Sequence, residues 1–291
     1  MFGRSLLCIG LTACAGASVA TAPTPTPPAG GPLALTYLGV AGWQLEAAGV
    51  TILADPYLSR PDLDAPLVPD AAAIAAHTPA RADLVVVGHS HADHLLDAPA
   101  VALRSGARLL GSISTTRVGR ASGIDDDHLI AVKGGEDLAL GSYSIRVIPS
   151  LHSAIGEAWQ FGEIAASPSL PMRLAEYREG GTLAYLVRIA GRELLVLDTA
   201  NFIERELVGL RPEIAIIAPG LRERIHDYTC RLLHTLGDPP IVIATHFDEW
   251  TKPVEAGAPP PPDVVKFADE VRACAPRTRV VIPRHFERFT L

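Results

Sequence analysis

The sequence predicts one layered α/β (α+β) domain, in which sheets are covered by helices. Short runs rich in Val, Ile and Leu alternate with Ala-rich stretches throughout residues 33–291, and such alternation is typical of layered folds. The chain has 291 residues, which is long enough to bury a sizeable core. Residues 33–291 show no repeat period that would indicate a solenoid and no linker that would divide them, so we expect one domain.

The first half of this domain contains closely spaced strands, whereas the second half alternates strand with helix. The expected strands cover residues 33–40, 43–47, 50–55, 83–88, 108–112, 143–150, 182–189, 193–198, 213–218, 241–245 and 279–283. The expected helices cover residues 70–77, 97–105, 113–121, 202–209, 224–236 and 263–274.

The composition disfavours several classes of protein. A hydrophobic content of 48% is too high for a disordered chain. The 25 Lys and Arg residues against 32 Asp and Glu residues give a net charge of −7, whereas a non-specific nucleic-acid binder carries a basic excess. We therefore expect no nucleic-acid partner. No apolar run reaches the roughly 20 residues that a membrane-spanning helix needs.

The first 32 residues resemble a targeting signal and a tether. Arg4 precedes an apolar run, and residues 11–14 (LTAC) resemble a bacterial lipoprotein signal, in which cleavage before Cys14 leaves that residue acylated. Residues 1–13 are then the signal peptide, and residues 14–32 are the lipidated N-terminus and Pro-rich tether of the domain at 33–291. A plain signal peptide or an unmodified N-terminal Cys is the alternative.

The lipoprotein signal predicts an exported protein that contacts the membrane through Cys14. Because Ala15 rather than Asp follows the Cys, the expected location is the periplasmic face of the outer membrane. Cys230 and Cys274 remain within the domain. They could pair in an oxidising compartment or remain buried thiols, and the sequence leaves both options open.

Residues 88–94 (GHSHADH), directly after an expected strand, carry the most informative pattern in the chain. His89 and His91 are two positions apart on an extended strand exit and therefore point to the same side, where they can bind one metal. Asp93 and His94 lie where the chain turns into a helix, so they can face a second metal. A single His is usually structural, but four ligand-type residues within six positions indicate a metal site.

Three further candidate ligands, His152, Asp198 and His246, each stand at or just beyond the end of an apolar strand. Side chains from adjacent strand ends can converge at one sheet edge. Together with the first four residues, they give five His and two Asp, which suits two Zn²⁺ ions about 3.5–4 Å apart. His285 occupies a similar strand-end position, but the strand and helix that precede His246 favour His246 as the ligand and leave His285 a substrate-side or structural role.

The seven residues resemble the ligand set of the metallo-β-lactamase superfamily, whose hallmark is an H-x-H-x-D-H loop followed by His, Asp and His on later strands. The likeness extends over residues 33–250. It implies a four-layer αβ/βα sandwich, two mixed sheets flanked by helices, with metals at one sheet edge. It also implies how the ligands divide: His89, His91 and His152 on the first metal, Asp93, His94 and His246 on the second, and Asp198 bridging. Asp55, at a strand end, would be a structural neighbour of the site.

The resemblance implies a zinc-dependent, dinuclear hydrolase that uses a metal-bridging hydroxide, oriented by Asp93, to cleave an ester-like bond such as a lactone or phosphodiester. Iron or manganese could occupy the site in place of zinc. The expected partner is a small-molecule substrate, anionic or acylated, and the sequence does not specify an oligomeric state. The alternatives are a true β-lactamase or a non-catalytic metal-binding envelope protein.

The segment between His152 and Thr182 lacks a strong strand pattern and is long for a loop inside a compact domain. It contains Trp159, Phe161, Met172 and Tyr177, and residues 170–179 could form a short amphipathic helix that presents Arg173 and Arg178. We expect either a lid over the active site or ordinary packing of these side chains onto the sheet.

Overall fold

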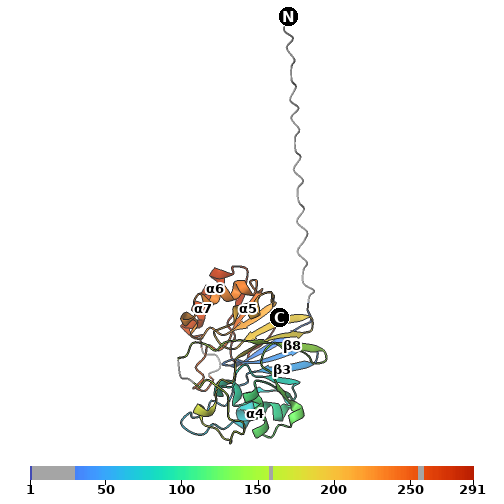
Figure 1. Ribbon diagram of the computed structural model, residues 1–291, viewed down its shortest axis with the longest axis vertical. Coiled ribbons are helices and arrows are strands. Elements are labelled where there is room, and N and C mark those ends of the chain that lie inside the picture. The colour runs from blue at the N-terminus through green and yellow to red at the C-terminus, as the bar shows by residue number, and fades with distance from the viewer. Residues whose placement is uncertain (2–29, 157–159, 255–258) are drawn as a thin grey trace.

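The computed structural model describes Met1 and residues 30–156, 160–254 and 259–291. The predicted signal peptide with Cys14, most of the predicted tether, and Trp159 lie outside the described residues. Two seven-stranded sheets form the centre of the molecule, and helices cover them on both outer sides (Figure 1). The predicted four-layer sandwich of two mixed sheets is therefore confirmed.

The first sheet is built from the first half of the chain and closed by the last strand. Its strands, in spatial order, are β14 (Arg288–Thr290), β1 (Ala34–Gly39), β2 (Gly42–Ala47), β3 (Val50–Ala54), β4 (Leu84–Val86), β5 (Arg108–Gly111) and β6 (Leu129–Ala131). The strands from β14 to β3 are antiparallel, and those from β3 to β6 are parallel. Because the strands β3 to β5 run parallel, the segments that follow them leave the sheet at the same edge.

The second sheet is likewise divided into an antiparallel part and a parallel part. Its strands, in spatial order, are β13 (Arg279–Val281), β12 (Ile241–Ala244), β11 (Ile214–Ile217), β10 (Arg192–Leu197), β9 (Leu183–Ile189), β8 (Tyr143–Pro149) and β7 (Asp137–Ala139). The strands from β7 to β10 are antiparallel, and those from β10 to β13 are parallel.

Helices cover the outer face of each sheet. The first sheet carries α1 (Ala71–His77), α2 (Ala92–Leu95), α3 (Ala98–Ser105) and α4 (Ile113–Ala121), and the second carries α5 (Glu204–Leu207), α6 (Tyr228–Thr235) and α7 (Pro262–Cys274). Short 3₁₀ turns lie at Asp126–His128, Leu174–Glu176 and Arg222–Arg224. No helix among the described residues is long and apolar enough to cross a membrane.

Three apolar layers hold the sandwich together. Trp43, Tyr37 and Val187 belong to the central layer between the two sheets. A second layer lies between the first sheet and α1–α4, and a third lies between the second sheet and α5–α7. Burial of apolar surface at about 25 cal/mol per Å² is the main force that favours this arrangement.

All eleven strands expected from the sequence are present. The strands β6, β7 and β14 have only three residues each, and sequence reasoning missed them, as it missed the four-residue helix α2. The helices expected at 202–209 and 224–236 are shorter than predicted. The short helix that residues 170–179 could have formed is absent: only one 3₁₀ turn forms there, and the Met172 carbonyl accepts a hydrogen bond from the Leu67 amide at 2.7 Å.

A disulfide joins Cys230 of α6 to Cys274 of α7, with their Cα atoms 5.1 Å apart. Of the two options that the sequence left open, the two cysteines therefore pair.

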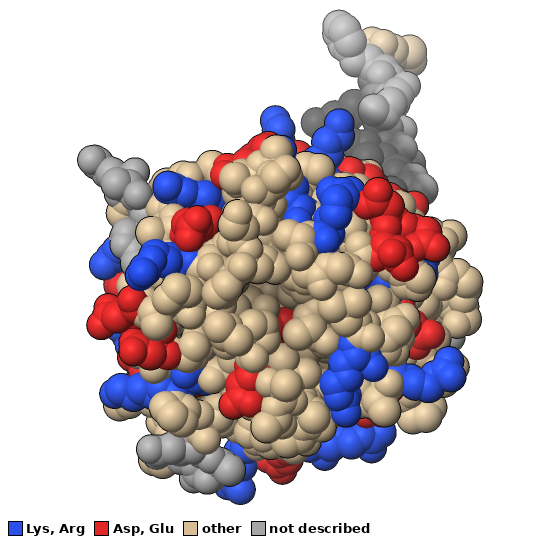
Figure 2. Space-filling model, turned by 90° about the horizontal axis from the view of Figure 1, so that it is seen from below, with Lys and Arg blue, Asp and Glu red and all other residues tan. Residues whose placement is uncertain are grey.

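Figure 2 shows the molecule from below the view of Figure 1: charged side chains of both signs are spread around this face, and its centre is hollowed and mostly uncharged.

Candidate metal centre

The GHSHADH segment leaves β4 at the edge where the parallel strands end. The Gly88 amide donates a hydrogen bond of 2.8 Å to Asp55 Oδ1, which fixes the start of the segment. A Cβ atom at Gly88 would lie 2.2 Å from Asp198 Oδ2, so only glycine lets the backbone pass this close to that carboxylate. His91 is extended and directly precedes α2, whose first turn contains Asp93 and His94.

The structure brings all seven predicted ligands together. Their ligand atoms form three overlapping groups, each with its atoms within 4.8 Å of one another: His89, His91 and His152; His89, His94 and Asp198; and Asp93, His94 and His246. The first and third groups are the ligand sets that the resemblance implied for the two metals. Asp198 lies between them, with Oδ2 2.7 Å from His89 Nδ1 and 3.4 Å from His94 Nδ1.

The ligand atoms of Asp93, His94 and His246 lie close together. The Nε2 atoms of His94 and His246 are 3.2 Å apart, and Asp93 Oδ2 lies 3.2 Å from His246 Nε2. His285, the rival candidate, is not in any of the three groups; its Nε2 lies 3.1 Å from Asp248 Oδ2 instead. The geometry therefore groups His246, and not His285, with Asp93 and His94.

The imidazoles of His89 and His91 are in the charge state that binds a cation. Burial lowers the pKa of His89 well below its ordinary value, and the neighbouring imidazoles of His94 and His152 lower it further. Burial likewise lowers the pKa of His91 to about 4. These imidazoles are therefore neutral at pH 7, and neutral imidazole is the form that binds a metal.

The pKa values of the two candidate carboxylate ligands, Asp198 and Asp93, are shifted in opposite directions. Burial raises the pKa of Asp198 to about 7 in the metal-free protein, and the adjacent carboxylate of Asp55 raises it as well. Burial acts in the same direction on Asp93, but His94 and His246 bring the pKa of Asp93 below its usual range. Asp198 Oδ1 is buried and has no hydrogen-bond partner among the described residues. An unpartnered buried carboxylate oxygen beside neutral imidazoles fits a bound divalent cation.

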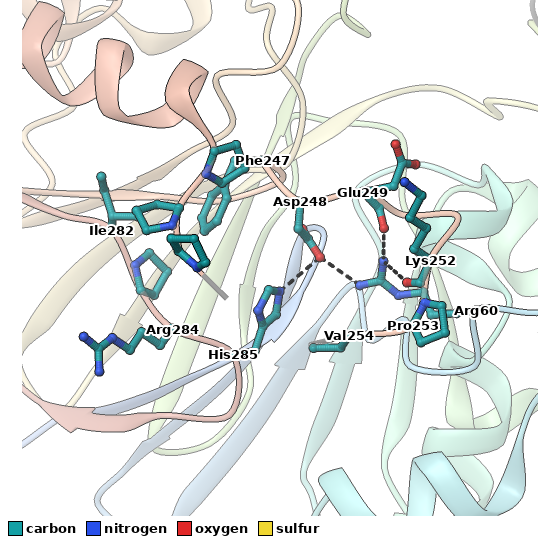
Figure 3. A pocket seen from close by; sticks show the side chains of 14 residues that line it. Arg60, Phe247, Asp248, Glu249, Lys252, Pro253, Val254, Ile282, Arg284 and His285 are labelled. Atoms are coloured by element: carbon teal, nitrogen blue, oxygen red, sulfur yellow. Dashed lines mark hydrogen bonds and ion pairs between the residues drawn. The ribbon is translucent and has the colours of Figure 1, made fainter. Parts of the chain in front are cut away.

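Sequence reasoning missed Asp248, which fixes the loop after His246. Tyr37 Oη and the Val40 amide donate to its Oδ1 at 2.9 and 2.7 Å, and Arg60 donates to its Oδ2 at 2.9 Å. Figure 3 shows Arg60 and His285 approaching this carboxylate from opposite sides. Only the spacing of two residues from His246 could have drawn attention to Asp248.

Two cavities meet at Asp248. The first, about 230 Å³, is lined by four of the candidate ligands, His91, Asp93, His152 and His246, together with an apolar wall. The second, about 700 Å³, lies around Arg60, Phe247 and His285 and is shown in Figure 3. Both include Asp248 in their lining.

Part of the segment after His152 packs into the core, whereas Phe161 is 47% exposed. Met172 and Tyr177 are buried in the layer beneath α1–α4, and neither lines the cavity at the candidate ligands. Ser90 Oγ donates a hydrogen bond to the Arg178 carbonyl and so ties the end of the segment to the GHSHADH loop. For Met172 and Tyr177, the packing alternative is confirmed.

A family model described as a β-lactamase superfamily domain matches residues 34–194, which include β1 to β9 and five of the seven candidate ligands. The chain belongs to the β-lactamase superfamily.

Relatives of this superfamily member cover most of its length. A UPF0173 metal-dependent hydrolase of Methanopyrus kandleri is 28% identical over 256 residues, which is 85% of this chain and 95% of the relative. Another, from Carboxydothermus hydrogenoformans, is 27% identical and covers 86% of this chain and 96% of its own length. Igni18, a metallo hydrolase from Ignicoccus hospitalis, has the same fold, with a TM-score of 0.63 and 20% identity over 89% of this chain and 98% of its own.

Proposed function

We propose that this metal-dependent hydrolase of the β-lactamase superfamily binds two divalent metal ions and cleaves an ester-like bond of a small molecule. Zinc is the metal that we propose. The observation that carries the proposal is the convergence of seven ligand-type side chains in three overlapping groups at one sheet edge. Five His and two Asp match the preference of zinc for nitrogen and oxygen ligands. Two full-length relatives are named metal-dependent hydrolases, which supports the same activity.

The ligands would divide as the groups do. His89, His91 and His152 would hold one ion, and Asp93, His94 and His246 the other. Asp198 would bridge the two ions, since it lies between His89 and His94. When bound, zinc acts as a Lewis acid and lowers the pKa of a coordinated water to about 7.

The side chains of the protein then have separate tasks. Asp93, which lines the cavity, would orient the attacking water through its carboxylate. The surrounding imidazoles keep Asp93 ionised, so it can accept a hydrogen bond from that water at neutral pH. In the overall reaction, the water oxygen bonds to the carbonyl carbon, the bond to the alcohol oxygen breaks, and a proton from the water passes to that oxygen.

We place the protein at the cell envelope, anchored through an acylated Cys14. The LTAC pattern at residues 11–14 supports this location. The disulfide between Cys230 and Cys274 supports it independently, because disulfides persist mainly in oxidising compartments outside the cytosol.

Metal analysis and chelation test the proposed function directly. We expect the purified chain to contain close to two zinc ions and to hydrolyse at least one of a generic ester, a lactone and a bis-aryl phosphodiester. Removal of the metal should abolish turnover, and added zinc should restore it. His91→Ala and Asp198→Ala should each lower metal content and turnover together. Full metal occupancy in both variants would overturn the assignment.

A further inference from the structure

The cavity beside the candidate ligands has an apolar wall made by three separate segments. Ile155 follows β8, Leu221 follows β11, and Trp250 follows β12. Ala200 and Ala218 also line the cavity. A substrate bound in this cavity can therefore bury part of its surface against this wall.

No Lys or Arg is among the described residues that line this cavity. Two arginines close to the wall in sequence are held elsewhere. Arg222 forms ion pairs with Asp263 and Glu270 of α7, at 2.7 and 2.9 Å. Arg224 donates to the Ala154 carbonyl at 2.7 Å, which braces the segment that carries Ile155.

Arg60, in the neighbouring larger cavity, is held in the same way. Its guanidinium pairs with Asp248 at 2.9 Å and donates to the Glu249 carbonyl at 2.8 Å, as Figure 3 shows. These three arginines stabilise the loops around the cavity, and none of them extends a charge into it.

The backbone holds Leu221 in an unusual conformation. Its φ is +64°, in the left-handed region where side chains other than glycine are strained. The ion pairs of Arg222 anchor the chain immediately after it. Trp250 is carried by the loop that Asp248 fixes through hydrogen bonds to Tyr37 and Val40. The wall is thus held in place by contacts made outside the cavity.

We propose that the substrate is a neutral carboxylic ester or lactone with a short apolar substituent, which lies against Ile155, Leu221 and Trp250. This inference rests on the proposed hydrolase function and narrows the expected substrate, anionic or acylated, to the acylated kind. An apolar substituent gains from burial against this wall, whereas a carboxylate at the wall would lose its water with no Lys or Arg beside it and with the Asp248 carboxylate in the same lining. Hydrolysis of the ester consumes one water and releases the carboxylic acid and the alcohol.

A matched pair of substrates tests the inference with the full chain loaded with zinc. 4-Nitrophenyl pentanoate and mono(4-nitrophenyl) succinate share a leaving group and have similar length, but only the second ends in a carboxylate. We expect kcat/KM to favour the pentanoate by about 10-fold or more. Bis(4-nitrophenyl) phosphate, an anionic diester, should be a poorer substrate than the pentanoate.

A charge placed on the wall should reverse this selectivity. Leu221→Arg adds a cation at the cavity, so the ratio of pentanoate to succinate turnover should fall by about 10-fold or more. Val208→Arg is the matched control, because Val208 is 67% exposed just after α5 and does not line the cavity. That variant carries the same added charge and should keep the wild-type ratio.

The outcomes separate the two proposals. If wild type hydrolyses the succinate or the phosphodiester as well as the pentanoate, the inference is wrong and the hydrolase function stands. If Leu221→Arg and Val208→Arg change the ratio equally, the wall does not determine selectivity. If neither ester is turned over, the affinities of the same proteins for the 4-nitroanilides of pentanoate and succinate can be compared by calorimetric titration. Tighter binding of the anionic succinate anilide to wild type overturns the inference. Failure of the hydrolase proposal appears separately, as absence of bound metal or as absence of turnover of every ester, lactone and phosphodiester.

Discussion

The Nε2 atoms of His94 and His246 lie 3.2 Å apart, although 152 positions separate the two residues in the chain. Asp93 Oδ2 is within 3.6 Å of His94 Nε2 and 3.2 Å of His246 Nε2. A buried imidazole nitrogen, a half-buried one and a carboxylate oxygen that converge in this way form an electron-rich site, which a shared cation would stabilise. The loop after β4 and the loop after β12 supply the two halves of the site.

The first prediction concerns the choice between His246 and His285. His246→Ala removes a member of the Asp93–His94–His246 group, so metal content should fall from about two ions to about one per chain. His285→Ala removes a partner of Asp248 but no member of any ligand group, so two ions should remain bound. Metal analysis of the two variants, made side by side, measures this. Loss of an ion from His285→Ala alone would reverse the assignment.

Gly88→Ala is the second prediction. The added Cβ would lie 2.2 Å from Asp198 Oδ2, so Asp198 or the strand exit must shift, and zinc affinity should fall by on the order of 10- to 100-fold. Gly31→Ala is the control, because its Cβ would meet nothing closer than Ala190 Cβ at 3.4 Å. Calorimetric zinc titration of the two variants gives the comparison. Wild-type affinity in Gly88→Ala would show that the close approach has no bearing on the site.

The third prediction is that Asp248 positions His246 for metal binding. Asp248→Asn leaves the Arg60 guanidinium, whose side chain is only 3% exposed, without its counter-charge, which costs about 3 kcal/mol. The His246 loop then loosens, and affinity for the second zinc should fall by about 10-fold or more, with the first little changed.

Glu249→Gln is the matched control for Asp248→Asn. The Glu249 side chain is exposed and hydrogen-bonds only to Thr251 among the described residues, so both zinc affinities should stay at their wild-type values. If Asp248→Asn lowers the melting temperature but leaves the second affinity intact, Asp248 stabilises the fold without positioning the ligand.

The sequence pointed to the candidate ligands because each follows a strong local pattern. His152, Asp198 and His246 stand after β8, β10 and β12, whose apolar runs mark them as strands, and the GHSHADH segment is contiguous. Asp248 could not be found in this way. Its partners Tyr37, Arg60 and His285 lie 211, 188 and 37 positions away, so its role exists only in the folded chain.

The parts of the fold that sequence reasoning missed are also non-local. The strand β14 has three residues and pairs with β1 at the opposite end of the domain, so its stability comes from that neighbour and not from its own propensity. The helix expected at 170–179 failed for a related reason: Met172 and Tyr177 are drawn into the core beneath α1–α4, and tertiary contacts there override the local pattern.

The fourth prediction concerns Cys14. If it is acylated, the wild-type chain should fractionate with membranes, and Cys14→Ser should release it, since anchoring that lasts requires two or more acyl chains. Cys8→Ser, which alters only the predicted signal peptide, is the control and should stay with the membrane. Membrane and soluble fractions are compared by immunoblot. Equal membrane retention of Cys14→Ser and wild type would contradict the lipoprotein proposal.

The last prediction concerns the disulfide between Cys230 and Cys274, which closes a loop across 44 positions. A cross-link of this span limits the freedom of the unfolded chain and contributes about 4 kcal/mol in the chain-entropy model, with 2–4 kcal/mol typical in practice. The double variant Cys230→Ser and Cys274→Ser should therefore melt roughly 5–12 °C below wild type.

The disulfide joins α6 to α7 on the outer side of the second sheet, and neither Cys lines the cavity at the candidate ligands. Zinc content and kcat/KM at 25 °C should therefore stay unchanged. Wild type treated with a reductant should match the double variant, because the same cross-link is lost. A melting temperature that neither treatment shifts would contradict the expected contribution of this cross-link to stability.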